Sequence, residues 1–220
     1  MNGVTESIVL WVAFAAGWLA VAAAALRRAP ELPPVRFTWW GLVLWLVVAI
    51  PSLIQLAVPR LLEHGMRDDA IVQHGQWWRL ITANVLQDGG LAGTLSNLSI
   101  LAVTLLVVGR TVRGILAVPI YVVGGIGSML LQLSNPGAGN SMATLALLTA
   151  VVVITLARPV SPATLIGSAV LILIGAGLTV LSNEHGPAIL LGLAIGVVVR
   201  LVQRAGRRAT TTTSQDRPSA

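Results

Sequence analysis

The chain has 220 residues, of which 55% are hydrophobic and 10% are charged, whereas a soluble domain carries roughly 25% charged residues; this deficit predicts that most of the chain lies in lipid. The sequence contains no cysteine, which excludes disulfides, thiol catalysis and cysteine metal sites. The formal net charge is +6 and every basic residue is Arg, but no basic patch is interleaved with aromatic residues in a soluble region, so we expect no nucleic-acid partner.

Seven apolar runs follow one another along the chain, and each approaches the roughly 20 residues that cross the hydrocarbon core of a bilayer. A longer polar connection, 59–79, separates the second run from the third. The runs are 8–26, 39–58, 91–109, 115–133, 141–157, 163–181 and 187–202. The sequence therefore predicts an all-α, polytopic membrane bundle. It has one span and a Pro/Arg-rich linker in 1–38, six spans in 39–203, and a disordered basic cytoplasmic tail in 204–220.

Arginine is distributed unequally between the two ends of these spans. Cytoplasmic loops carry an excess of Arg, and most of the arginines lie in the linker after the first span, between the third and fourth spans, and in the tail. With a cytoplasmic tail, seven spans place the N-terminus outside, and the starts of the fifth and seventh spans lie on that outer side. The Arg-, Ala- and Val-rich composition is typical of a GC-rich bacterium, which indicates a multi-pass protein of the plasma membrane.

The stretch NPGAGNSMATLALLTA, residues 135–150, delivers Ser141 to the start of the fifth span after a glycine-rich turn. His185 stands directly before Gly186 and Pro187, where the seventh span begins, and Pro is favoured at the first position of a helix. Two helices that start on the same side can bring these side chains within hydrogen-bond distance, which is the nucleophile–base pairing of acyl transfer. The alternative is that Ser141 caps its helix and that His185 only lies at the membrane interface.

Two further features accompany this pair. Ala188, Gly192 and Gly196 follow His185 on one helix face, and such small residues let a neighbouring helix come close. Asn97 lies within the third span, where an amide is costly without a partner. An Asn side chain can donate to the oxyanion of an acyl-transfer intermediate, so Asn97 is a candidate oxyanion donor.

These residues occur in an order that resembles the rhomboid family of intramembrane serine proteases, over 39–202 of the chain. Family members carry a W-R pair in the long first loop and an Asn in the second core span. A G-x-S-G motif opens their fourth core span, and an H-x-x-G-x-x-x-G-like pattern opens the sixth. The matching residues here are Trp78 and Arg79, Asn97, the stretch GNSM at 139–142, and His185, Ala188 and Gly192.

The resemblance implies a six-helix rhomboid-like core, preceded here by one extra N-terminal transmembrane helix. It implies that Ser141 is the nucleophile and His185 the base of a dyad that cleaves transmembrane segments of membrane proteins. Asn97 and the backbone N–H of Ser141 would stabilise the oxyanion, while Trp78 and Arg79 would anchor the loop in the membrane interface. The expected partners are transmembrane protein substrates and the lipid bilayer, with no cofactor and no metal.

The chain departs from the family at several positions of the site. The His that the family places four residues before its Asn is Gly93 here, and an earlier His maps onto Gln87 or Asp88. The Gly after the nucleophile is Met142, and an aromatic four residues after the Ser is Leu145. These departures support an alternative function, a rhomboid-like pseudoprotease that binds transmembrane helices without cutting them. The lack of carboxylates within the spans argues against a third class, a small-solute carrier.

Overall fold

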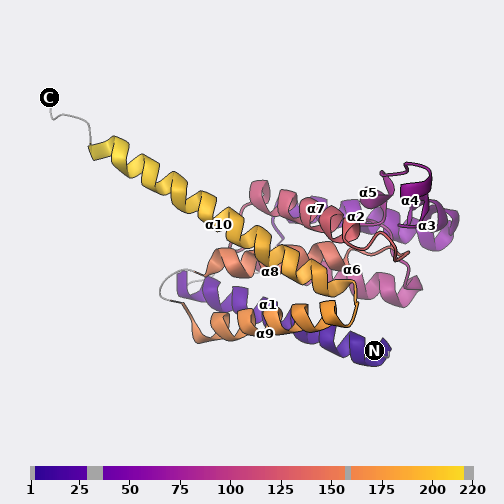
Figure 1. Ribbon diagram of the computed structural model, residues 1–220, viewed down its shortest axis with the longest axis horizontal. Helices are drawn as coiled ribbons and strands as arrows, with labels where there is room; N and C mark the ends of the chain where they lie inside the picture. Colours follow the sequence, from indigo (N-terminus) through magenta and orange to yellow (C-terminus); the bar gives the residue numbers. More distant parts are fainter. Residues whose placement is uncertain (1–2, 29–36, 157–159, 216–220) are drawn as a thin grey trace.

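The computed structural model describes residues 3–28, 37–156 and 160–215. Within these residues the secondary structure is helical and includes no β-strand (Figure 1), which confirms the all-α part of the predicted fold class. Most of the predicted linker, 29–36, and the end of the predicted tail, 216–220, lie outside the described residues. The helices are α1 (Gly3–Arg28), α2 (Trp39–Ala57), α3 (Arg60–Gly65), α4 (Ala70–Gln73), α5 (Arg79–Thr82), α6 (Gly90–Val108), α7 (Gly114–Leu130), α8 (Ser141–Thr155), α9 (Pro162–Val180) and α10 (His185–Gln215).

Each predicted apolar run corresponds to one of these helices. In the described part of the chain, five helices are long and apolar enough to cross a membrane: α1, α2, α6, α9 and α10. The apolar helices α7 and α8 are shorter, and α3, α4 and α5 are brief turns within the polar connection between α2 and α6. This composition is that of a multi-pass membrane protein.

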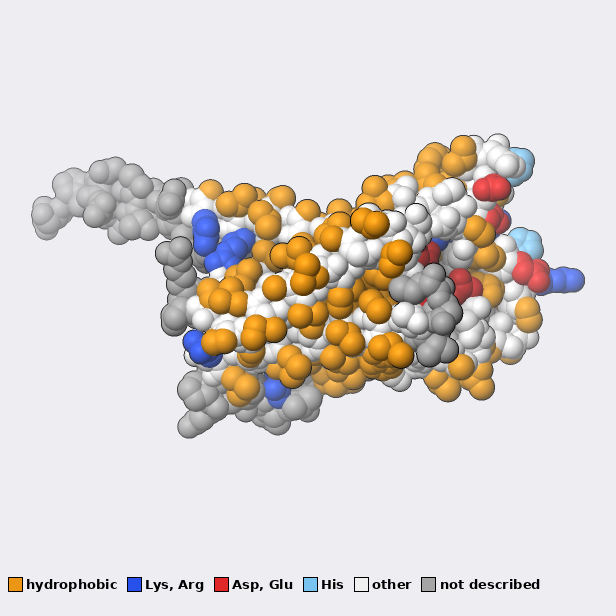
Figure 2. Space-filling view, turned by 60° about the horizontal axis from the view of Figure 1, so that its bottom comes forward, with side chains coloured by type: hydrophobic (Ala, Val, Ile, Leu, Met, Phe, Trp, Pro, Cys, Tyr) orange, Lys and Arg blue, Asp and Glu red, His pale blue; other side chains and the backbone are white. Residues whose placement is uncertain are grey.

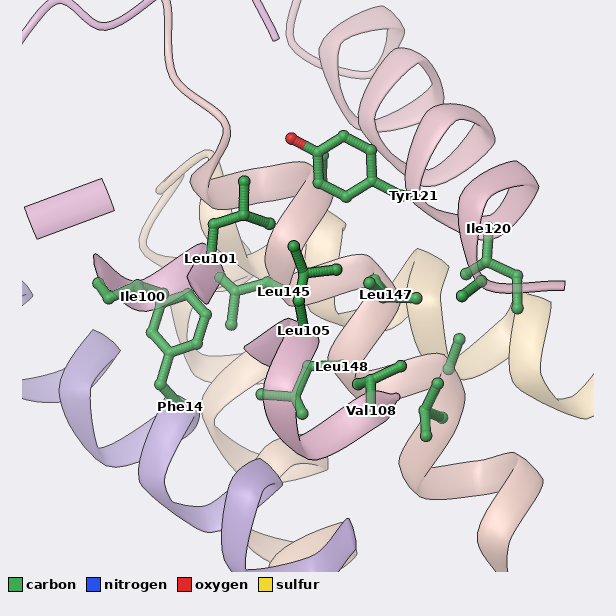
Figure 3. Packing of buried hydrophobic residues seen from close by; sticks show 14 of the residues in the cluster. Phe14, Ile100, Leu101, Leu105, Val108, Ile120, Tyr121, Leu145, Leu147 and Leu148 are labelled. Carbon is green, nitrogen blue, oxygen red and sulfur yellow. The ribbon is translucent and has the colours of Figure 1, made fainter. Parts of the chain in front are cut away.

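α8 is the central helix of the bundle. All of its residues from Met142 to Val153 are buried, and a helix that is hydrophobic all round belongs in a protein interior. In Figure 1, α8 lies between α1 and α9 on one side and α7 on the other. Figure 3 shows Leu145, Leu147 and Leu148 of α8 among side chains of α1, α6 and α7.

α10 lies close along α8 because small residues line the face between the two helices. Ala188 is fully buried there. A Cβ on Gly192 would meet the carbonyl oxygen of Ala146, and a Cβ on Gly196 would lie 2.6 Å from the carbonyl oxygen of Ala150. Larger side chains at these positions would therefore force the two helices apart.

α1 belongs to the same hydrophobic core as the later helices, a question that the sequence leaves open. Phe14 is buried in this core, and the helix packs on α9, α8 and α6. The carbonyl oxygen of Ala16 lies 2.8 Å from the position that a Cβ on Gly167 would take. Trp18 Nε1 donates a hydrogen bond of 2.9 Å to Thr104 Oγ1 of α6. The seven apolar helices thus form one bundle.

α10 continues well past residue 202, where the sequence placed the end of the last span, and reaches Gln215. The predicted tail, 204–220, therefore begins within α10, whose backbone is helical over 204–215. Residues 203–209 are mostly Arg, Gln and Ala, which are good helix formers, and extending an existing helix avoids the cost of nucleation. Helical structure for this reason extends beyond the apolar segment.

Charged side chains separate toward the two ends of the bundle. Figure 2 shows Asp, Glu and His side chains gathered at one end together with some Arg, further Arg side chains at the opposite end, and a broad apolar surface between the two ends. The polar connection between α2 and α6 belongs to the acidic end, together with Glu184, which directly precedes α10.

Candidate active site

A glycine-rich loop, residues 135–140, leads into α8, and backbone hydrogen bonds hold it against the connection between α2 and α6. Arg67 and Gly137 exchange two N–H···O bonds of 2.9 Å. The N–H of Gly139 donates to the carbonyl oxygen of Ala83, also at 2.9 Å. The start of α8 is therefore fixed by the loop that precedes it.

Ser141 and His185 meet at the starts of their helices. Ser141 is the first residue of α8 and follows Asn140 at the N-cap position, so Ser141 is not the cap residue. His185 is the first residue of α10 and is only 8% exposed. Ser141 Oγ lies 3.0 Å from His185 Nε2, within the roughly 2.6–3.2 Å of a nucleophile–base pair. The structure brings together the two side chains that the sequence singled out.

The other nitrogen of the His185 ring contacts a residue that sequence reasoning missed. Nδ1 lies 3.1 Å from Asn183 Oδ1, which also accepts the backbone N–H of His185 at 3.0 Å. Asn183 Nδ2 donates at 2.6 Å to Oε1 of Glu6, in the first turn of α1. An Asn shortly before a helix is a recognisable turn signal, but nothing in the sequence connects Glu6 to a residue 177 positions away.

Asn97 Nδ2 and Ser141 Oγ border the same small space, beside Gly139. A Cβ on Gly139 would lie 3.5 Å from Asn97 Nδ2, 3.6 Å from Gln87 Oε1 and 3.7 Å from Ser141 Oγ. The absence of a side chain at Gly139 therefore leaves room among three polar atoms. A donor at this place can reach an oxyanion formed at Ser141, which requires N–H groups at about 2.7–3.1 Å.

Asn97 is oriented by Gln87, one of the two positions onto which the family's earlier His maps. Asn97 Nδ2 donates to Gln87 Oε1 at 2.8 Å. Gln87 is fully buried; its backbone N–H donates to Gln55 Oε1 at 3.1 Å and its Nε2 to Ser52 Oγ at 3.3 Å. Because an amide NH₂ group has two N–H donors, the second N–H of Asn97 is available to a bound group.

An ion pair between the buried side chain of Arg67 and the partly exposed side chain of Glu184 ties the start of α10 to the loop before α8. Arg67, which is fully buried, donates to Glu184 Oε2 at 2.7 Å and through Nε to the carbonyl oxygen of Asn135 at 2.6 Å. Glu184 directly precedes His185. Arg67 thus fixes Glu184, the neighbour of His185, relative to the loop that precedes Ser141.

Trp78 and Arg79 form their own cluster, within the connection between α2 and α6. Arg79 is buried and donates to Asp68 Oδ2 and to the carbonyl oxygen of Met66, both at 2.9 Å. Its guanidinium carbon lies 5.3 Å from the centroid of the Trp78 ring. The hydrogen bonds described for Arg79 stay within this connection, so the two residues organise the loop rather than contact the Ser141–His185 pair.

A cavity of about 220 Å³ opens at the Ser141–His185 pair. It is smaller than the roughly 300–1,000 Å³ of pockets that bury a drug-sized ligand. The N-terminal half of α1 forms one wall, so a transmembrane segment cannot approach Ser141 from this side while the helix stays in place. The residues of α1 that line the cavity are Ser7, Leu10, Trp11 and Phe14.

The positions that depart from the rhomboid pattern differ in their surroundings. Met142 is buried and lines the cavity, whereas Leu145 is fully buried in the core. Gly93 lies one helical turn before Asn97 on α6, and no atom stands within 4 Å of the place where its Cβ would be. The site lacks a side-chain donor at position 93 but has room for one.

Among the described residues, no group of three or more His, Asp or Glu side chains is placed to hold a metal ion. Comparisons of the chain with protein-family models, with curated proteins and with solved structures find no match.

Proposed function

We propose that this chain is an intramembrane serine endopeptidase of the rhomboid type, which cleaves transmembrane segments of other membrane proteins. The observation that carries the proposal is the 3.0 Å contact between Ser141 Oγ and His185 Nε2. A serine is a weak nucleophile until an adjacent base takes its proton. Here the two groups lie on separate apolar helices, beside a cavity and an amide donor.

In the proposed reaction, His185 Nε2 takes the proton of Ser141 Oγ as Oγ attacks the carbonyl carbon of a peptide bond. The oxyanion accepts hydrogen bonds from Asn97 and from backbone N–H groups in the first turn of α8, which have no intrahelical partners. The positive end of the helix dipole favours the same negative charge. His185 then gives its proton to the leaving amine, and water hydrolyses the acyl-enzyme to a carboxylate product and free Ser141.

In this proposal the site opens to the outer side of a bacterial plasma membrane, with the N-terminus outside and the C-terminus in the cytoplasm. The distribution of charge supports this orientation, because the acidic side chains in view lie at one end of the bundle, whereas the charged side chains in view at the opposite end are Arg (Figure 2), and cytoplasmic loops are rich in Arg. The water that hydrolyses the acyl-enzyme then enters from the polar, outer end.

A rhomboid-like pseudoprotease, which binds transmembrane helices without cutting them, is the second candidate. The buried side chain of Met142 in the cavity and the missing donor at Gly93 favour it. Loss of one oxyanion donor lowers the rate about 10²- to 10³-fold. The two candidates share the fold and differ in whether Ser141 is activated.

Labelling with a fluorophosphonate serine probe tests the activation of Ser141. We expect the detergent-purified wild type to be labelled at Ser141, as located by mass spectrometry, and the label to be lost in Ser141→Ala and in His185→Ala. Ser96 lines the same cavity, so Ser96→Ala is the matched control and should keep the label. A folded wild type that stays unlabelled contradicts the protease and favours the pseudoprotease.

Cleavage is tested in proteoliposomes that contain a panel of single-span membrane proteins. If the probe labels the wild type, then wild type that has not been treated with the probe should cut at least one of them within its span, and Ser141→Ala should bind the same protein without cutting it. Labelling without cleavage of any panel member would limit the proposal to an activated serine.

A further inference from the structure

The imidazole of His185 can take a proton from Ser141 in only one of its two neutral tautomers. Nε2 must carry the lone pair, so the proton of the neutral ring must lie on Nδ1. The tautomer of a histidine is set by the hydrogen bond that its other nitrogen makes. The group that faces Nδ1 therefore decides whether the pair can act as nucleophile and base.

The amide oxygen of Asn183 faces Nδ1. It lies 3.1 Å from Nδ1 and 3.0 Å from the backbone nitrogen of His185. A backbone N–H can only donate, so the Asn183 atom that faces it must be the oxygen and not the NH₂ group. An oxygen at this place also accepts from Nδ1–H, which stabilises the tautomer with the lone pair on Nε2.

The contact between Glu6 and the NH₂ group of Asn183 requires the same orientation of the Asn183 amide. Asn183 Nδ2 donates to Glu6 Oε1 at 2.6 Å, and an ionised carboxylate has only acceptors. Hydrogen bonds to ionised groups are shorter and stronger than neutral ones. Glu6 Oε1 lies 3.8 Å from His185 Nδ1, beyond hydrogen-bond distance, so Glu6 acts on the ring through Asn183.

We propose that Asn183 and Glu6 are positioning residues for His185, and that they extend the Ser141–His185 pair to a hydrogen-bonded chain of four residues. This inference rests on the proposed function, because the tautomer affects catalysis only if His185 acts as a base. In a Ser-His-Asp triad the carboxylate contacts the histidine directly and fixes its tautomer. Here the amide of Asn183 contacts the ring of His185, and the carboxylate of Glu6 contacts that amide. The N-terminal helix α1 thereby supplies part of the site.

The tautomer of His185 can be read by ¹⁵N NMR, which distinguishes protonated from unprotonated ring nitrogens. The chain has 3 histidines, so the signals missing from His185→Ala identify this ring. We expect the wild type to carry the proton on Nδ1, and Asn183→Ala to show a mixture of tautomers. A wild-type ring protonated on Nε2, or an Asn183→Ala ring that is unchanged, would overturn the proposal.

The rate of fluorophosphonate labelling provides the second measurement. Loss of a hydrogen bond to a charged group lowers a rate about ten- to a hundredfold. We expect a loss of about tenfold for Glu6→Ala and about a hundredfold for Asn183→Ala. The exchanged pair, Glu6→Gln with Asn183→Asp, restores an acceptor at Nδ1 and a donor behind it. It should recover most of the labelling rate, which a merely structural role of these residues does not predict.

Two controls separate positioning from folding. Thermal unfolding shows whether each variant is folded, and Asp69→Ala removes an exposed carboxylate of the connection between α2 and α6 and should leave labelling and tautomer unchanged. A wild type whose tautomer depends on Asn183 but which is never labelled contradicts the proposed function and retains the positioning role. If the wild type is labelled, but the Glu6 and Asn183 variants keep its labelling rate and its His185 tautomer, only the positioning role is overturned.

Discussion

Ser141 Oγ lies 3.0 Å from His185 Nε2, although the two residues are 44 positions apart. The contact follows from the packing of α8 against α10, each of which begins with one of these residues. Gly192, about two turns into α10, lets the backbones come close. The geometry of the pair is thus set by two packed helices rather than by a mobile loop, which is how a precise site is held.

We expect Gly192→Val to destabilise the protein and to abolish labelling of Ser141. A Cβ at position 192 would meet the side chain of Thr149 and the carbonyl oxygen of Ala146, and overpacking of this kind costs about 1–3 kcal/mol. Gly177→Ala on α9 is the control, because no atom lies within 4 Å of its new Cβ and Ala favours a helix by about 0.8–1.0 kcal/mol over Gly. Thermal unfolding in detergent compares them, and an unchanged unfolding temperature for Gly192→Val would contradict the packing argument.

Gly139→Ala should leave the fold intact and lower the rate at which Ser141 is labelled. The new Cβ would lie 3.5–3.7 Å from Asn97 Nδ2, Gln87 Oε1 and Ser141 Oγ, which is ordinary van der Waals contact, so we expect the unfolding temperature to stay near that of the wild type. The methyl group would occupy the space that the oxyanion needs. We expect labelling to fall about a hundredfold, the typical effect of losing an oxyanion donor. Wild-type labelling in this variant would place the oxyanion elsewhere.

Gly93→His should raise the rate of labelling. Position 93 lies one turn before Asn97 on the same face of α6, and its Cβ would enter open space. A His side chain there would add a second side-chain donor to the oxyanion site, for which a gain of up to about a hundredfold is expected. Gly93→Leu, of similar bulk but without a donor, is the control and should give no gain. Equal rates for both variants would show that position 93 does not face the oxyanion.

The apolar helices could be predicted from the sequence because the bilayer demands long runs without charge. The start of α8 is an example, since the sequence and the structure both place it at Ser141. The end of α10 could not be predicted in this way. The apolar run predicts how much of the helix lies in lipid but not the full length of the helix, and α10 continues to Gln215.

The Ser141–His185 pair could be predicted because each residue opens a helix on the same side, whereas its supporting residues could not. An acidic residue such as Glu6 is favoured in the first turn of any helix by the helix dipole, so its presence in the sequence does not point to the site. Its bond to Asn183 depends on how α1 packs against α9, which no local pattern encodes. Gln87 likewise became part of the site only when the fold brought it to Asn97.

The orientation in the membrane can be tested with single cysteines, because the chain contains none. Asp69 and Arg113 are both exposed; Asp69 lies in the connection between α2 and α6, and Arg113 in the turn after α6, at the opposite end of that helix. We expect a membrane-impermeant maleimide to label Asp69→Cys in intact cells and to label Arg113→Cys only after the cells are broken. The reverse pattern would place the site on the cytoplasmic side.

Trp11→Ala should widen the access to Ser141 for bulky molecules. Trp11 lies in the wall that α1 forms, and its side chain both lines the cavity and is 48% exposed. Removing the indole would open the cavity sideways, so we expect a bulky fluorophosphonate to gain more in rate than a small one. Ile8→Ala shortens a side chain of the same helix that is 59% exposed and should leave the ratio of the two rates unchanged. If Trp11→Ala also leaves the ratio unchanged, α1 does not limit access, and a substrate segment must reach Ser141 along another side of the bundle.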